Sequence, residues 1–317
     1  MTGVRVPAQL GPGEEFDRIR AIWGRLGDRV AGAGEDCAFL EIGGERLAFS
    51  VDLSTEGTHF QIGWMTPVEI GWRAASAALS DLAAVAADPL GVLASVGVPA
   101  EWPAEHVTDL MEGVGAAAAA VGARVWGGDL VRAACVILDV CVVGRLAAAP
   151  VLRSGAKPGD ELWVTGRLGG PFAALAAWNA RAEPDRAARE RFVHPVPRVR
   201  EGHWLRDHGA RALIDLSDGL VPDAGHLAAA SHVGWTIDVD AVPLHPSAET
   251  ADMALAGGEE YELLAAFPPG LDDNDAVEFA ARFGIPLTRV GRADQAQGVR
   301  LLRDETRVWV PESYRHF

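Results

Sequence analysis

The sequence predicts a layered α/β fold in two domains. Predicted strands and amphipathic helices alternate along the chain, which is typical of helices packed on sheets. The chain has 317 residues, which favours about two domains. A stretch at residues 147–159 that contains prolines and basic residues separates two such alternating halves. We therefore expect an N-terminal domain at residues 1–148 and a C-terminal domain at residues 149–317.

The N-terminal half alternates between predicted helices and strands. Apolar residues at helical spacing predict amphipathic helices, and short apolar runs between turn residues predict strands. A capping box with proline at the first helical position, Thr66–Glu69, marks the start of the second helix. The predicted helices cover residues 14–30, 67–87 and 103–121, and the predicted strands cover residues 37–40, 47–51, 91–98, 124–126 and 135–144.

The C-terminal half shows the same two kinds of element. An alanine-rich helix begins at Gly169–Pro171 and ends near residue 182, and the charged, proline-containing stretch 183–200 predicts a mobile connector leading into a helix. A strand at 212–215 breaks at Ser217–Gly219, before a helix from about residue 222 to 231. The other predicted strands are residues 161–165, 235–239, 261–267, 287–291 and 299–302.

The composition restricts the partners of the protein. Acidic residues outnumber basic ones by 44 to 28, and the resulting net charge of −16 disfavours nucleic acids and anionic membranes. No apolar stretch is long enough to cross a bilayer, and the first residues do not resemble a signal peptide. Cys37, Cys135 and Cys141 form no CxxC pair, which favours a reducing compartment. We expect a cytoplasmic protein.

The predicted hairpin at residues 37–51 has turn residues, Gly43 and Gly44, between its strands and an acid at each end. Asp36 lies at the start of one strand and Asp52 at the end of the other, so the hairpin would bring both carboxylates to one edge. Carboxylates held together need a shared proton or a cation. With Ser50 and His59 nearby, the oxygen-rich set favours Mg²⁺. For this hairpin alone, a turn residue and a strand terminator remain the simpler interpretation.

Acids recur at other predicted strand ends and turns. Each acid alone is better explained as a cap or turn residue. Glycines beside three of these acids favour a ligand-binding site over a simple cap, because glycine permits close approach of the backbone and amides that bind anions. The acids are Asp36, Asp52, Asp129, Asp215 and Asp218, with Asp81 on a predicted helix.

Two further stretches have two interpretations each. Arg153–Lys157 is either a phosphate-binding patch or a solvated linker, and Gly257–Glu262 is either a ligand-binding loop or a charged turn. The motifs of P-loop enzymes, protein kinases, α/β hydrolases and zincins are absent from the sequence. The residues alone therefore indicate a Mg²⁺-dependent enzyme acting on phosphates or a non-catalytic metal or nucleotide binder.

Seven motifs, taken together and in order, resemble the thiamine-monophosphate kinase family. The resemblance runs from the first helix to Tyr314, and it implies the two-domain fold of the superfamily that includes aminoimidazole ribonucleotide (AIR) synthetase. The motifs are Gly34–Ala38, Ser50–Asp52 with Glu56–Phe60, Leu79–Ala84 with Asp88–Pro89, Gly127–Asp129, Arg153–Asp160, Ile214–Leu220 and Gly257–Leu263.

The resemblance implies that the γ-phosphate of ATP is transferred to the phosphate of thiamine monophosphate, with several Mg²⁺ ions bound. The implied Mg²⁺ ligands are Asp36, Ser50, Asp52, Asp81, Asp129, Asp215 and Asp218, of which Asp52, Asp129 and Asp218 would be catalytic. The implied nucleotide contacts are Gly128, Asp129, Arg153 and Ser217, and the implied contacts to thiamine monophosphate are His59, Glu259 and Tyr314. The family also implies a homodimer in which the N-terminal sheets join, with the nucleotide near that junction.

The chain departs from the family pattern at Glu35, Val51, Leu130, Val131 and Glu260. Some of these changes remove hydroxyl groups that could contact metal or phosphate. A paralogue acting on another small substrate, such as an AIR-synthetase-like enzyme, is therefore the alternative. The selenophosphate synthetase and hydrogenase-maturation dehydratase of the same superfamily are disfavoured, because their reactive cysteines near the two chain ends are missing.

Overall fold

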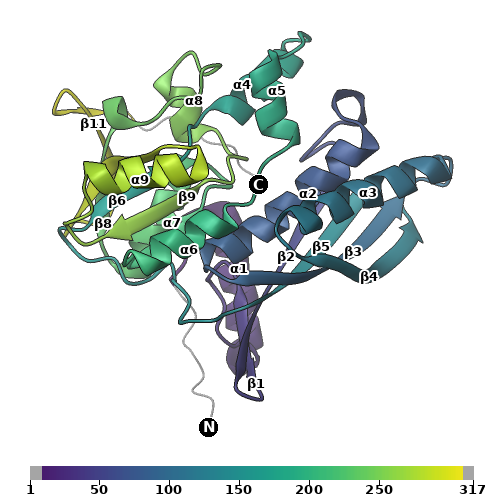
Figure 1. The fold of residues 1–317 in the computed structure, drawn as a ribbon, viewed down its shortest axis with the longest axis horizontal. Helices are drawn as coiled ribbons and strands as arrows, with labels where there is room; N and C mark the ends of the chain where they lie inside the picture. The colour runs from purple at the N-terminus through teal and green to yellow at the C-terminus, as the bar shows by residue number, and fades with distance from the viewer. Residues whose placement is uncertain (1–8, 310–317) are drawn as a thin grey trace.

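The computed structural model describes residues 9–309, which form two β-sheets with helices packed on them (Figure 1). The N-terminal half forms a five-stranded sheet in the order β1-β2-β5-β3-β4. The C-terminal half forms a seven-stranded sheet in the order β12-β11-β8-β10-β6-β9-β7. The predicted α/β class is confirmed. Among the described residues, no helix combines the length and the apolar composition that a membrane span requires.

The N-terminal elements follow the sequence pattern closely. The hairpin of β1 and β2 turns at Gly43 and Gly44, which adopt φ angles of 61° and 85° that suit glycine. Thr66 caps α2 in a complete capping box with Glu69. The elements are α1 (Glu14–Leu26), β1 (Ala38–Ile42), β2 (Glu45–Thr55), α2 (Pro67–Ala84), β3 (Asp88–Val98), α3 (Ala104–Ala120), β4 (Arg124–Arg132) and β5 (Ile137–Arg145).

Two expected positions in this sheet are wrong. Asp52 lies inside β2 and not at its end, because pairing with β5 continues to Thr55. The Gly127–Asp129 segment lies inside β4 and not after it, because parallel pairing with β3 extends the strand to Arg132. In both cases a neighbouring strand supplies hydrogen bonds that outweigh the local turn signal.

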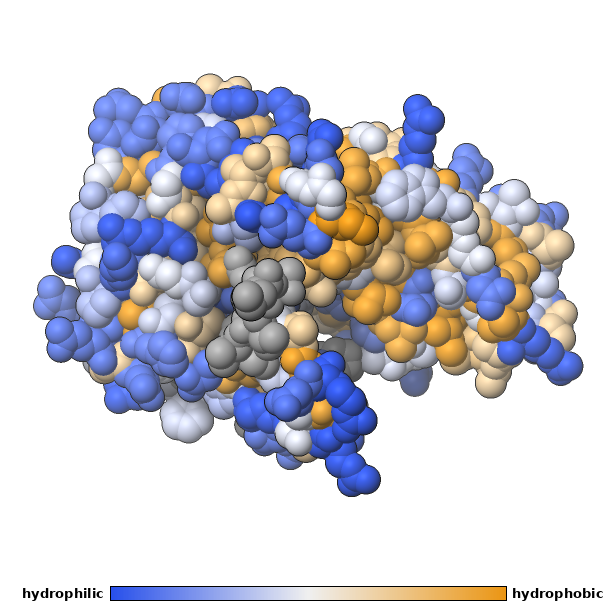
Figure 2. Space-filling view, turned by 90° about the horizontal axis from the view of Figure 1, so that it is seen from below, coloured by the Kyte–Doolittle hydropathy of each residue, from blue (hydrophilic) through white to orange (hydrophobic). Residues whose placement is uncertain are grey.

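Helices α2 and α3 cover one face of the five-stranded sheet (Figure 1). They approach so closely that a Cβ at Gly71 would lie 1.8 Å from the carbonyl oxygen of Leu110, and one at Gly113 would lie 1.9 Å from that of Val68. The opposite face, here called the outer face, has no covering element in the described part of the chain. Seen from below, hydrophobic residues gather on the side that carries this sheet (Figure 2).

The C-terminal sheet is covered on both faces. One core cluster joins it to α7 and α8, and another joins its other face to α6, α9 and the end of α2. The elements are β6 (Glu161–Thr165), α4 (Gly170–Asn179), α5 (Arg186–Val193), α6 (Val199–Asp207), β7 (Ala212–Asp215), α7 (Leu220–Ser231), β8 (Gly234–Asp238), α8 (Ala251–Ala256), β9 (Leu263–Phe267), α9 (Asp273–Phe283), β10 (Leu287–Asp294), β11 (Gly298–Arg303) and β12 (Thr306–Val308).

The stretch expected to be a mobile connector contains a packed helix. Asp185 caps α5 by accepting hydrogen bonds from the amides of Ala187 and Ala188, and Phe192 is buried in the core of the N-terminal half. The capping acid and the buried aromatic residue therefore order the segment despite its prolines and charges. The expected domain boundary after residue 148 falls in the segment 146–160, which contains neither helix nor strand, and the division there stays a prediction.

Helix α2 connects the two halves. It packs on β2 and β5 of the N-terminal sheet, and it also contacts α6 and β7 of the other half. Gly202 of α6 is close to this helix, since a Cβ there would lie 2.3 Å from the carbonyl oxygen of Ala83. Side chains on one face of α2 are thereby placed opposite both β2 and the loop that follows β7.

Candidate active site

A cavity of about 240 Å³ lies where α2, β2, the loop after β7 and the loop before β9 meet. Its lining combines segments that are far apart in the sequence. The lining residues that the sequence analysis identified are Asp52, His59, Asp81, Arg153, Asp215, Ser217, Asp218 and Glu259. The fold therefore brings most of the expected site residues to one place.

Three carboxylates form the first cluster of the site. Asp36 precedes β1, Asp81 lies in α2 and Asp215 ends β7, and carboxylate oxygens of all three lie within 4.8 Å of one another. Ser50 Oγ donates a hydrogen bond to Asp81 Oδ2 at 2.5 Å, and Ser80 Oγ donates one to Asp215 Oδ2 at 2.6 Å. The hydroxyl groups hold two of the carboxylates in fixed orientations.

Arg153 supplies positive charge beside this cluster. Its Nε and Nη2 donate to the two oxygens of Asp36 at 3.1 and 2.8 Å. Its backbone amide donates to Glu35 Oε2 at 2.7 Å, so Glu35 anchors the segment that carries the arginine. A bidentate arginine–carboxylate pair is both strong and directional. The arginine is thus held at the edge of the cavity by two residues that precede β1.

The carboxylates destabilise one another in the absence of a cation. Burial, followed by the charge of Asp36, raises the pKa of Asp215 to about 7. Burial and the neighbouring charges of Asp215 and Asp36 raise the pKa of Asp81 well above its usual range. Burial, followed by the charge of Glu259, raises the pKa of Asp52 to about 6. A divalent cation would remove this repulsion, and the purely oxygen donor set fits Mg²⁺.

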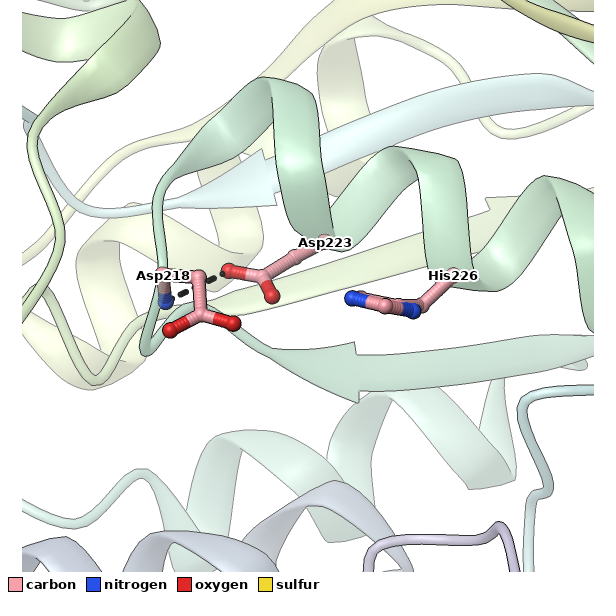
Figure 3. A group of neighbouring side chains, drawn as sticks. All are labelled: Asp218, Asp223 and His226. Atoms are coloured by element: carbon pink, nitrogen blue, oxygen red, sulfur yellow. Dashed lines mark hydrogen bonds between the residues drawn. The ribbon is translucent and has the colours of Figure 1, made fainter. Parts of the chain in front are cut away.

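A second cluster consists of Asp218, Asp223 and His226 (Figure 3), whose ligand atoms also lie within 4.8 Å of one another. Asp223 Oδ2 accepts hydrogen bonds from the amides of Asp218 and Gly219 at 3.1 and 3.0 Å. His226 Nδ1 accepts one from the amide of Gly11 at 3.2 Å, and burial lowers the pKa of His226 to about 3. Its proton is therefore on Nε2, so in this arrangement the ring offers no lone pair to a metal. Asp223 supports the loop that carries Asp218, whereas His226 holds the segment before α1 through Gly11.

Sequence reasoning missed Asp223 and His226. They lie three residues apart in α7 and therefore on one face of the helix, directly after the Ser217–Gly219 break. That spacing is the signal that could have identified them.

The expected ligand loop at 257–262 borders the same cavity. The amide of Glu259 donates to the carbonyl of Ser217, and that of Tyr261 donates to the carbonyl of Leu216, both at 2.7 Å. Glu259 and Tyr261 adopt φ angles of 68° and 49°, in the left-handed region. Tyr261 Oη donates to Glu259 Oε2 at 2.5 Å, and Nη2 of Arg73 lies 2.5 Å from the same oxygen. Sequence reasoning also missed Arg73.

Among the described residues, two expected site residues, Gly128 and Asp129, lie outside both the cavity lining and the carboxylate cluster. Asp129 pairs with Ser95 on β3 and is exposed on the outer face of the sheet, and Gly128 precedes it in the same strand. Tyr314 lies outside the described residues. The roles assigned to Gly128, Asp129 and Tyr314 stay predictions.

The positions that depart from the family pattern avoid the centre of the cavity. Glu260 is fully buried in the C-terminal half, where its Oε1 accepts a hydrogen bond from the amide of Gly169, and burial raises its pKa to about 8. Leu130 and Val131 are exposed on β4, and Val51 lines only the margin of the cavity while being 62% exposed. The departures therefore leave the carboxylate cluster intact.

The fold and the site define the class of protein. Residues 34–146 match the family model described as AIR synthase related protein, N-terminal domain, and residues 157–304 match the corresponding C-terminal domain. The chain is an AIR synthase related protein.

Individual relatives identify the family within this class. Thiamine-monophosphate kinase from Mycobacterium tuberculosis (strain CDC 1551 / Oshkosh) is 34% identical over 272 residues, which cover 82% of this chain and 81% of the relative. The enzyme of that name from Salmonella typhimurium is 34% identical over 321 residues, 95% of each chain. The solved structure of AaThiL complexed with AMPPCP and TMP aligns with a TM-score of 0.83 at 29% identity, covering 96% of this chain and 97% of that one. The chain belongs to the thiamine-monophosphate kinase family.

Proposed function

We propose that the protein transfers the γ-phosphate of ATP to the phosphate of thiamine monophosphate, giving thiamine diphosphate and ADP. The observation that carries the proposal is the cavity itself, where buried carboxylates with raised pKa values meet two arginines. Relatives named thiamine-monophosphate kinase and the relative complexed with AMPPCP and TMP support the same substrates. The alternative is a paralogue that uses ATP on another small substrate.

Mg²⁺ fits the carboxylate-rich part of the cavity. The residues that would hold it there are Asp36, Ser50, Asp52, Asp81, Asp215 and Asp218. Asp129 lies on the outer face of the sheet, so the Mg²⁺ role predicted for it would belong to a separate position at that face. Bound Mg²⁺ would neutralise the charge on the phosphate oxygens of two anions that must meet.

The chain itself supplies orientation. We assign Arg153 and Ser217 to the nucleotide, since both line the cavity beside the carboxylates, and Gly128 and Asp129 to the nucleotide as well. We assign His59 and Glu259 to thiamine monophosphate, together with Tyr314. The backbone bond from Glu259 to Ser217 couples the two binding loops, so that movement of one is transmitted to the other. Direct transfer needs no nucleophilic side chain, and positioning is the main contribution of the protein.

We also propose that the protein is a homodimer joined through the outer face of the N-terminal sheet. Val51 and Leu53 of β2, Leu93 of β3 and Val131 of β4 expose apolar side chains on that face. A contiguous exposed apolar patch of this kind favours a partner surface. Asp129 lies on the same face, so a nucleotide near the junction would meet it.

Light scattering tests the dimer. We expect a dimer at micromolar concentrations, and we expect Leu53→Lys to shift the mass towards the monomer because it buries a charge at the junction. Ile22→Lys, on the exposed surface of α1, is the matched control and should leave the mass unchanged. A wild-type monomer across this range would contradict the proposed junction.

Product analysis tests the function. With Mg²⁺, ATP and thiamine monophosphate, we expect thiamine diphosphate and ADP in equal amounts, measured by mass spectrometry. Unphosphorylated thiamine is the control acceptor and should give no thiamine diphosphate, because the acceptor must be a phosphate oxygen. ATP consumption with other small phosphates but not with thiamine monophosphate would favour the paralogue. Binding of ATP without any turnover would favour a non-catalytic binder.

A further inference from the structure

Arg73 is a buried cation in the wall of the cavity. It lies in α2 with a side chain that is 4% exposed. Nη1 donates to the carbonyl of Phe192 at 2.8 Å, and the guanidinium carbon lies 3.9 Å from the centre of the Phe192 ring. These contacts fix the plane of the guanidinium group, because both the hydrogen bond and the cation–π contact depend on its orientation.

The other terminal nitrogen of Arg73 is only partly satisfied. Nη2 lies 2.5 Å from Glu259 Oε2, so the two groups form an ion pair. Within the described part of the chain, however, this buried nitrogen has no partner with the geometry of a hydrogen bond. A buried donor without an aligned acceptor is costly, so an anion that took the place of Glu259 beside this nitrogen would satisfy it.

The position of Arg73 suits the acceptor side of the reaction. Arg73, Ala77 and Asp81 all line the cavity at four-residue spacing along α2, which places Arg73 about 12 Å along the helix from Asp81. Arg153 already pairs with Asp36 at the carboxylate cluster. Arg73 and Arg153 thus mark two separate parts of one cavity, and phosphate transfer needs positive charge near each of the two reacting anions.

The pair formed by Arg73 and Glu259 also matches the charges of the substrate. Thiamine monophosphate carries an anionic phosphate and a cationic ring. If the phosphate pairs with Arg73 and the ring pairs with Glu259, the buried arginine and the partly exposed glutamate each exchange one partner for another, and neither is left unpaired. A simple phosphate would pair with only one of the two groups, and a neutral ligand with neither.

We propose that Arg73 binds the acceptor phosphate of thiamine monophosphate, and that Glu259 leaves Arg73 to pair with the cationic ring. This inference rests on the proposed function, and it adds a specificity residue to the substrate site. The ion pair joins α2 to the loop before β9, so the two charged groups already lie side by side where the phosphate and the ring of the substrate would bind.

Calorimetric binding of three probes tests this inference: thiamine monophosphate, unphosphorylated thiamine and AMPPCP. Arg73→Met should lower the affinity for thiamine monophosphate by about 10- to 100-fold, which corresponds to the loss of a charge-assisted hydrogen bond. The affinity for thiamine should not fall, because Glu259 is freed for the ring, and the affinity for AMPPCP should change by less than about threefold. In steady-state kinetics the KM for thiamine monophosphate should rise, with the KM for ATP nearly constant.

Arg189→Met is the matched control. Arg189 also ties α5 to α2 through an ion pair, with Glu69 Oε1 at 2.7 Å, but it does not line the cavity. It should preserve the preference for thiamine monophosphate over thiamine. Thermal melts of both variants verify that each is folded.

The double variant Arg73→Met/Glu259→Gln separates substrate binding from a purely structural ion pair. The double variant is compared with Glu259→Gln alone. If Arg73 acts only by holding Glu259, Arg73→Met causes no further loss of affinity for thiamine monophosphate in the Glu259→Gln background, and the inference is wrong. We expect a further loss. An unchanged ratio of thiamine monophosphate to thiamine binding in Arg73→Met also overturns the inference while leaving the proposed function intact. A wild-type protein that does not distinguish the two ligands overturns both.

Discussion

Replacement of Asp52 by asparagine is expected to give a folded protein whose ATP-dependent turnover is lowered by at least about a thousandfold. Asparagine keeps the size of the side chain inside β2 but removes a negative charge of the cavity that would help to hold Mg²⁺. Electrostatic stabilisation dominates phosphoryl transfer, so the lost charge affects the rate far more than the fold. Turnover at saturating ATP and thiamine monophosphate measures the effect.

The stability of the Asp52→Asn variant gives an independent check. Burial raises the pKa of Asp52 to about 6, so the ionised carboxylate is unfavourable in the metal-free folded protein above that pH. The variant should therefore melt no lower than the wild type at about pH 8 without Mg²⁺. Asp207→Asn makes the same replacement of a carboxylate by an amide at an exposed position on α6 and serves as the control. Near-normal turnover in Asp52→Asn would show that Asp52 has only a structural role in β2.

The elements that the sequence predicts well are those with local signals. The capping box at Thr66 and the glycine turn at Gly43 each fix a backbone conformation within four residues, and both are present as predicted. The Gly127–Asp129 segment was misjudged because its conformation depends on hydrogen bonds to β3, which no local pattern reveals. Helix α5 was missed for a related reason, since the burial of Phe192 against the N-terminal half orders it.

The same distinction applies to the site. Asp36 and Asp215 could be predicted because acids at strand ends are visible in the sequence, and the fold brings them together with Asp81 of α2. Arg73 could not be predicted, because in the sequence it is one charged residue in an apolar helix. Its role depends on the distant Glu259, which the loop before β9 brings within 2.5 Å. Residues whose function consists of a long-range pairing become visible only in the structure.

The affinity for Mg²⁺ is expected to rise by about one to two orders of magnitude from about pH 6 to about pH 8. Burial is the main cause that raises the pKa of Asp52 to about 6 and that of Asp215 to about 7, so both bind protons within this range in the metal-free protein. Each must lose its proton before it can act as a ligand. Calorimetric titration of the metal-free protein with MgCl₂ at both pH values measures the change.

The thermal stability of the metal-free protein should fall as the pH rises, and Mg²⁺ should offset this fall. A carboxyl group whose pKa is higher in the folded state contributes stability that is fully present below its unfolded pKa of about 4 and is lost as the pH rises through its folded pKa. Asp215 therefore lowers the Tm of the metal-free protein as the pH rises through about 7. His226, whose pKa is lowered to about 3, has the opposite effect, but only up to its unfolded pKa of about 6.5. The comparison is therefore made from about pH 6.5 to about pH 8.5.

Saturating Mg²⁺ should raise the Tm more at the upper end of this range than at the lower end. At the upper end the carboxylates are ionised and bind Mg²⁺, whereas at the lower end protons compete with Mg²⁺ for the same oxygens. In Asp215→Asn this difference between the two pH values should be smaller, since one of the titrating carboxyl groups is gone, whereas Asp207→Asn should behave like the wild type. An equal Mg²⁺-induced shift at both pH values would show that the cluster of Asp36, Asp81 and Asp215 does not hold the ion.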